Sequence, residues 1–126
     1  MTGFEVELTE AIAQKMELKV EWKVLPFDSL LAGLQRDRWD LVMECSDTFD
    51  TTYLVADWCE RGGTPLVWGS VIDMVWQVSD FWSRPPDGWA PTSLRSLYPR
   101  PPKPGQTPSS TEVGVLGPVV GQAGSA

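Results

Sequence analysis

The chain has 126 residues, enough for one compact domain, and its 17 Asp and Glu residues outnumber its 10 Lys and Arg residues. The net charge of −7 lies in residues 1–63, which hold 13 acids and 6 bases, while residues 64–126 are balanced. This charge argues against nucleic acid and anionic membrane as partners, and the absence of histidine argues against most hydrolase and zinc chemistry. We therefore expect no nucleic-acid partner, no metal site and no cofactor.

Hydrophobic periodicity in the first part of the chain alternates between helix and strand. Apolar residues at i+4 steps from Phe4 to Met16 predict a helix over about 5–16. Strict alternation from Leu18 to Val24 predicts a strand with one polar face. The N-terminus shows neither a basic leader nor an apolar signal segment, so we expect a soluble chain without an export signal.

A second helix and strand follow Pro26. Leu30, Leu31 and Leu34 form an apolar helical face that ends near Arg36, and residues 39–43 form a short apolar run typical of a buried parallel strand. The order helix, strand, helix, strand predicts an α/β layer with a mostly parallel sheet.

The second half of the chain has weaker signals. Residues 64–68 and 71–78 have strand-like composition. Nine of the 11 prolines fall at or after Pro85, and residues 83–110 show almost no apolar period. The sequence therefore predicts a folded part over 1–82, followed by a largely disordered Pro-, Gly- and Ser-rich tail over 83–126.

Cys45 and Cys59 are the chain's two cysteines, and their separation fits no metal-ligand pattern. They are either free thiols or one disulfide formed in an oxidising compartment. The sequence leaves both alternatives open.

Five motifs follow one another in order along residues 3–43: Gly3-Phe4-Glu5-Val6-Glu7-Leu8, Ala11-Ile12-Ala13, Pro26-Phe27-Asp28-Ser29-Leu30, Gly33-Leu34-Gln35 and Trp39-Asp40-Leu41-Val42-Met43. In this order they resemble the polar amino-acid type of periplasmic solute-binding protein, the receptor of bacterial ABC importers. A fainter continuation through residues 46–48, 55–57 and 62–67 resembles later stretches of the same family. Residues 3 to about 70 are thus identified as similar to part of its first lobe.

This resemblance implies a partial three-layer lobe and a function of binding a small polar solute, such as an amino acid, for import. The implied partners are that solute and the membrane permease of the importer, and the implied location is periplasmic or extracytoplasmic. It implies no enzymatic activity. Residues 71–110 resemble no part of the family, and a truncated or frame-shifted reading frame would explain the change in composition.

The resemblance also implies three ligand-binding residues. Phe27 matches a position where an apolar or aromatic side chain lies against the ligand; its alternative role is a hydrophobic contact at a helix start. Ser46 and Thr48 match hydroxyls that hydrogen-bond an amino-acid carboxylate, and their alternative role is ordinary turn and cap chemistry.

One expected ligand contact is missing. The family's carboxylate-binding arginine would fall at Thr51 or Thr52, and Glu44 nearby would repel a carboxylate. Ligand binding is therefore expected to be impaired.

Two alternatives to the receptor function remain open. The chain is a non-functional truncated or frame-shifted fragment, or it is an enzyme relative of the same fold, of the dehydratase or transglycosylase type. The acidic residues of the middle segment suggest a solvated face rather than a calcium loop or catalytic pair: Asp47, Asp50, Asp57 and Glu60. Stacked indoles can bind sugars or bases, and the chain has seven tryptophans: Trp22, Trp39, Trp58, Trp68, Trp76, Trp82 and Trp89. Trp22 and Trp39 lie on predicted core strands, which favours packing, and the later ones have no predicted scaffold, so the sequence does not favour a stacking site.

Overall fold

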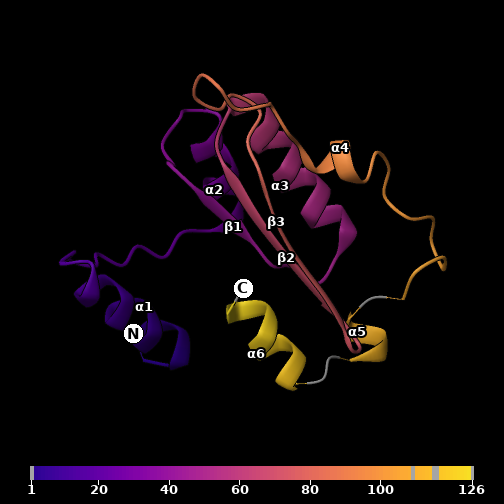
Figure 1. Cartoon of the computed structure of the whole chain (residues 1–126), viewed down its shortest axis with the longest axis horizontal. Helices are drawn as coiled ribbons and strands as arrows, with labels where there is room; N and C mark the ends of the chain where they lie inside the picture. The colour runs from indigo at the N-terminus through magenta and orange to yellow at the C-terminus, as the bar shows by residue number, and fades with distance from the viewer. Residues whose placement is uncertain (1, 109, 115–116, 126) are drawn as a thin grey trace.

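The structure is a computed structural model that describes residues 2–108, 110–114 and 117–125. Its elements follow in the order α1 (Phe4–Lys15), α2 (Phe27–Leu34), β1 (Val42–Glu44), α3 (Phe49–Gly62), β2 (Leu66–Ile72), β3 (Val75–Phe81), α4 (Leu94–Leu97), α5 (Ser110–Val113) and α6 (Gly117–Ser125) (Figure 1). The chain is a small α/β unit, as predicted.

The sheet has three strands in the order β1-β2-β3. β1 runs parallel to β2, with Val42 opposite Leu66, and β2 runs antiparallel to β3, with Leu66 opposite Phe81. The antiparallel ladder is the longer one, so the predicted mostly parallel sheet is wrong and the sheet is mixed. The cause is the tight turn at Asp73, whose φ of 53° reverses the chain directly between β2 and β3.

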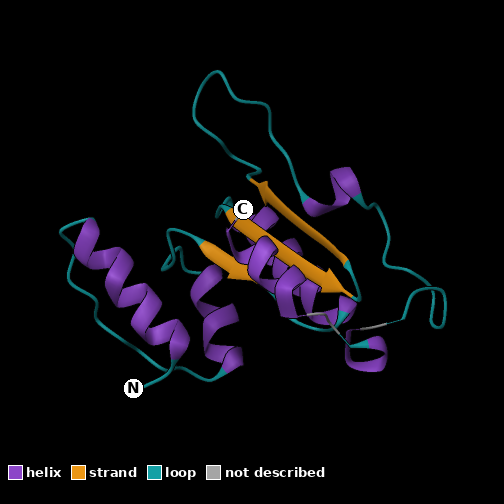
Figure 2. Cartoon of the chain, turned by 60° about the horizontal axis from the view of Figure 1, so that its bottom comes forward, coloured by secondary structure: helices purple, strands orange, loops and turns teal. Residues whose placement is uncertain are grey.

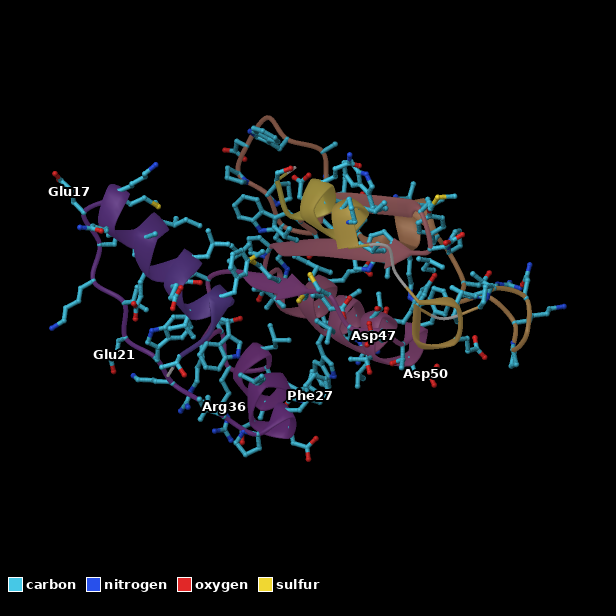
Figure 3. All side chains as sticks on the ribbon, turned by 90° about the horizontal axis from the view of Figure 1, so that it is seen from below. Glu17, Glu21, Phe27, Arg36, Asp47 and Asp50 are labelled. Atoms are coloured by element: carbon cyan, nitrogen blue, oxygen red, sulfur yellow. The ribbon has the colours of Figure 1, made fainter. Side chains whose placement is uncertain are left out.

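Helices lie on both faces of the sheet. α3 packs on one face through Val55, Ala56 and Cys59, against Leu66 and Trp68 of β2. α6 contacts β2 and β3, and Figure 3 shows it on the side of the sheet opposite α3. The main core is the α3 side, where α2 also packs on α3.

Helix α3 is the longest element that was not predicted from the sequence. The Thr48 hydroxyl caps its first turn by accepting a hydrogen bond from the Thr51 N–H at 3.3 Å. It ends at Gly63, which has a left-handed backbone conformation with a φ of 78°. Glycine adopts this conformation without steric strain because it has no Cβ. A cap, an apolar stripe and a terminal glycine therefore define this helix.

The predicted strand over Leu18 to Val24 does not form. Helices α1 and α2 confirm the predicted helices on either side of it, but residues 18–26 run between them as an extended connection (Figure 2). A strand needs the ladder of a neighbour, and no backbone hydrogen bond joins 19–25 to another segment within the described residues. Figure 1 shows α1 standing apart from the sheet.

The Pro-rich segment after β3 is ordered where it meets α3, which corrects the predicted largely disordered tail. Leu94 of α4 is 2% exposed in the core cluster. The Tyr53 hydroxyl donates to the Tyr98 carbonyl at 2.9 Å, and Arg95 donates to both Asp57 carboxylate oxygens at 2.7 and 2.8 Å. The buried Leu94 and the hydrogen bonds of Tyr53 and Arg95 therefore order a segment that lacks a periodic apolar pattern. The division of the chain at 82/83 stays a prediction.

The Asp57–Arg95 pair makes stability depend on pH. Hydrogen bonds from Arg95 hold the pKa of Asp57 below its ordinary value, against a smaller opposing effect of burial. Because the folded pKa is the lower one, the pair stabilises the fold above the unfolded pKa of about 4 and loses that contribution as pH falls through the folded value. Both side chains are partly exposed, at 40% and 31%, so we expect less than about 1 kcal/mol.

We therefore predict that Asp57→Asn lowers the free energy of unfolding slightly at pH 7 and not at all near pH 2. Urea unfolding at several pH values measures this difference. Asp87→Asn, in an exposed loop, is the control and should match the unmodified chain throughout. A constant difference between Asp57→Asn and the unmodified chain across the pH range would contradict the prediction.

Candidate functional site

A cavity with a volume of about 420 Å³ lies between α2, β1 and the start of α3. Its walls are mainly apolar and come from all three elements and the loop before β1: Phe27, Leu30, Leu31, Leu34, Trp39, Leu41, Val42, Met43 and Val55. We call it the β1 cavity. Its size and lining are those of a small-molecule site or a groove for a short apolar segment.

The β1 cavity lies where the carboxyl end of a parallel strand meets the amino end of a helix. β1 ends at Glu44, the chain turns through Ser46 and Asp47, and α3 begins at Phe49. Figure 3 shows Asp47 and Asp50 near one another at this end of α3, and Phe27 on α2. Open α/β sheets place their ligands outside the carboxyl ends of parallel strands.

Glu44 forms the polar end of the cavity. Its side chain is 5% exposed, and its two carboxylate oxygens accept hydrogen bonds from the Ser46 N–H at 2.7 Å and from the Thr52 hydroxyl at 3.0 Å. The Ser46 and Thr52 hydroxyls lie 3.4 Å apart. This network joins the end of β1 to the first turn of α3 and so fixes the floor of the cavity.

The charge of the cavity is negative. Among the described lining residues only Glu44 carries a charge, and neither Lys nor Arg lines the cavity. A triphosphate or a carboxylate would meet no cationic partner here. The lining suits uncharged, apolar groups, with hydroxyl and carboxylate acceptors at one end.

The structure brings two of the three predicted ligand-binding residues together. Phe27, 45% exposed, and Ser46 both line the β1 cavity. Thr48 is not among its lining residues, because its hydroxyl caps α3 and donates to the Thr51 hydroxyl at 2.9 Å. That is the cap chemistry considered from the sequence as its alternative role. A ligand-binding role for the three residues stays a prediction.

The structure also shows where Thr51 and Thr52 lie, the two positions at which the carboxylate-binding arginine was expected. Thr51 lines the cavity, while Thr52 is buried and bonds Glu44. The sequence reading took Glu44 as a repulsive charge and missed its partners. The polar pair Glu44 and Thr52, eight residues apart across a strand end and a helix start, was the available signal.

The predicted buried strand over residues 39–43 is wrong at its start, because β1 begins at Val42 and Trp39 lies outside it. Its indole N–H donates to the Leu30 carbonyl at 2.9 Å, and the ring lies directly against Gly33 of α2. The ring therefore forms a cavity wall held by α2 rather than part of a strand.

Neither Cys45 nor Cys59 forms a disulfide in the structure. Cys45 is exposed at the end of β1 and lines the cavity, whereas Cys59 is buried in the core. Burial raises the pKa of the Cys59 thiol to about 11, so this sulfur stays protonated at neutral pH. Of the two alternatives left open by the sequence, the structure has the two thiols and not the disulfide.

These observations define a small α/β unit with a ligand-sized cavity at the end of its parallel strand. The model of one family, described as the ThiF family, matches residues 6–126. The chain belongs to the ThiF family.

Several curated proteins are similar to this chain. A probable adenylyltransferase/sulfurtransferase, MoeZ of Mycobacterium tuberculosis (strain ATCC 25618 / H37Rv), is 46% identical over 80 residues, covering 64% of this chain and 20% of that protein. A sulfur carrier protein adenylyltransferase of Thermus thermophilus is 40% identical over 87 residues, covering 69% of this chain and 32% of that protein. The chain thus spans about a fifth to a third of the length of these relatives.

A third relative is of another kind. The probable amino-acid-binding protein YxeM of Bacillus subtilis is 43% identical over 70 residues, covering 53% of this chain and 26% of that protein. This relative is of the same kind as the solute-binding proteins that the motifs of residues 3–43 resemble. It covers about half of the chain, whereas the family match runs over residues 6–126.

The family match overturns the predicted identity. Membership of the ThiF family replaces the solute-binding receptor, and with it the predicted roles in ABC import, amino-acid binding and docking to a permease. The prediction of no enzyme is wrong as well, since these relatives are named adenylyltransferases. The match includes residues 71–110, the segment for which a truncated or frame-shifted reading frame was considered.

The error in the predicted family has a physical origin. The motifs of residues 3–43 are two amphipathic helix starts and one short apolar stretch, which many α/β proteins share. None of the helices in the described part of the chain is long and apolar enough to cross a membrane. The extracytoplasmic location stays a prediction.

Proposed function

We propose that this chain takes part in adenylyl transfer to a sulfur carrier protein. The observation that carries the proposal is the family match over residues 6–126, together with relatives named for that activity. Adenylyl transfer joins the α-phosphorus of a nucleoside triphosphate to an acceptor and releases pyrophosphate.

The β1 cavity supports a specific share in that reaction. Its lining has no cation for a triphosphate, and the sequence has neither a G-x-G-x-x-G nor a G-x-x-x-x-G-K loop to surround phosphates with N–H groups. We infer that the cavity receives an uncharged, apolar part of a reactant and that other groups hold the phosphates. The predicted ligand contacts Phe27 and Ser46 would serve in this role, with Thr48 holding the start of α3 in place.

A direct test mixes the chain with a sulfur carrier protein and magnesium ATP. Calorimetric titration measures binding of the carrier, and intact mass spectrometry measures the gain of an adenylyl group by the carrier. The Thermus relative serves as the positive control. A carrier that neither binds the chain nor gains an adenylyl group would contradict the proposal.

A matched pair of variants tests the cavity itself. Phe27→Ala removes a ring from the cavity wall, and Phe4→Ala removes the same ring from α1, where it is 79% exposed. We expect Phe27→Ala to weaken binding of the carrier or nucleotide by about tenfold, the effect of losing a contact of moderate strength, and Phe4→Ala to leave it unchanged. Equal effects of the two would remove the cavity from the proposal.

A further inference from the structure

The outer edge of β1 is open. The Val42 N–H donates to the Pro65 carbonyl at 3.0 Å, on the side of β2. Because successive residues of a strand point their N–H and C=O groups to alternate sides, those of Met43 point away from β2. β1 is the last strand of the sheet on this side, and Leu41 and Met43 are 54% and 71% exposed. Such an edge is a template for another strand.

Residues 18–24 have the sequence that such an edge accepts. Leu18, Val20, Trp22 and Val24 alternate with Lys19, Glu21 and Lys23. In the structure the segment is extended, and its Val24 side chain is 80% exposed. Within the described residues no backbone hydrogen bond joins 19–25 to another segment, and Trp22 makes a side-chain contact of 3.4 Å with Glu10 of α1. The segment is thus a strand sequence without a strand neighbour.

The connection between these two elements has the length and form of a parallel crossover. Residues 25–41, which include α2, separate the segment from β1. Parallel neighbours need a crossover of a dozen or more residues, usually through a helix packed on the sheet. α2 already packs on α3, in the layer that covers one face of the sheet. Residues 18–24 can therefore dock on β1 while α2 stays in its present position.

The charges are complementary as well. Lys19 and Lys23 lie on the polar face of the segment, and Asp40 lies two residues before β1. Glu21 and Lys23 pair with each other at 3.1 Å but are 78% and 70% exposed, so this contact holds the segment only weakly.

We propose that residues 18–24 of the same chain dock on the open edge of β1 as a fourth, parallel strand, and that the structure has this strand undocked. The docked strand lies beside Leu41 and Met43, two lining residues of the β1 cavity, and so narrows its mouth. Docking is a conformational gate on the cavity. It concerns the fold of the chain alone and is independent of adenylyl transfer.

Amide hydrogen exchange of the full chain, measured by NMR at two protein concentrations, tests this. A docked strand protects every second amide in 18–24, and the Met43 amide, at least about tenfold relative to the intervening amides. Uniform exchange at the rate of an unpaired chain overturns the proposal. Protection that increases with protein concentration also overturns it, because the strand is then donated by a second copy.

Two substitutions separate docking from folding. Val24→Gln changes the apolar face of the segment and Glu21→Gln its polar face, and both side chains are largely exposed in the undocked structure. Neither substitution should therefore change global unfolding. We expect Val24→Gln to abolish the protection of 18–24 and Met43, and Glu21→Gln to retain it. Equal protection, or equal loss, in the two variants would refute docking through the apolar face.

Discussion

Replacing Leu94 by Ala is expected to lower the free energy of unfolding by about 2–5 kcal/mol. Leu94 is 2% exposed and belongs to the core cluster, where α4 packs on α3. Removing its side chain loses the transfer free energy of the methyl groups and leaves a cavity that the rigid α3 and the sheet cannot close. Since small domains are stable by about 5–15 kcal/mol, this is a large fraction of the total.

Leu97→Ala is the matched control for this prediction. Leu97 lies in the same short helix but is 47% exposed, so its loss should change stability by no more than about 0.5 kcal/mol. Denaturant unfolding followed by tryptophan fluorescence measures both variants, and an unchanged m-value shows that the midpoints are comparable. If both variants unfold like the unmodified chain, the segment after β3 contributes nothing to the core and the sequence-based prediction of a disordered tail is restored.

The helices α1 and α2 were predictable because their signal is local. Apolar residues at i+4 steps are enough to place α1, but they do not show whether another element covers the stripe. Phe4 and Met16 are 79% and 62% exposed, so the apolar face of α1 lacks the cover that such a stripe usually has. Periodicity predicts where a helix forms and which face is apolar, whereas burial depends on the partner.

Helix α3 was missed because its stripe is short and its residues are mixed. Asp50, Thr51, Thr52 and Asp57 interrupt the apolar pattern, and the buried positions include the small residues Ala56 and Cys59. The cap at Thr48 and the left-handed Gly63 were readable, but Gly63 also fits a turn before a strand. Gly63 directly precedes the strand-like residues 64–68, and the helix before it was not predicted.

The candidate site was predictable only in part. Phe27 and Ser46 meet in the β1 cavity because α2 and the end of β1 are neighbours in space, which the order of elements already suggests. The Asp57–Arg95 contact joins residues 38 apart, and the Tyr53–Tyr98 contact joins residues 45 apart. Such pairs depend on how an irregular segment folds back, and no local pattern predicts them. The motifs of the first 43 residues, in turn, are helix starts and a short strand that many α/β proteins share, and they did not predict the family whose model matches the chain.

Gly33→Ala is the second large expected effect, and two opposing contributions decide its sign. Alanine in place of glycine inside a helix favours folding by about 0.5–1 kcal/mol. A Cβ at this position, however, would overlap the Trp39 indole, whose N–H is bonded to the Leu30 carbonyl at 2.9 Å. Moving the ring costs about 1–3 kcal/mol in packing and about 1 kcal/mol for the broken hydrogen bond. We therefore expect a net loss of about 1–3 kcal/mol.

A double-mutant cycle with Trp39→Leu isolates the overlap. Without the indole, nothing opposes the helical preference of alanine, so Gly33→Ala should stabilise the Trp39→Leu chain by up to about 1 kcal/mol. Denaturant unfolding of the four proteins measures this reversal of sign. A destabilisation of the same size in both backgrounds would show that the cost arises in the backbone of α2. The expected reversal instead places it at the contact that forms one wall of the β1 cavity, because Trp39 is held there by α2.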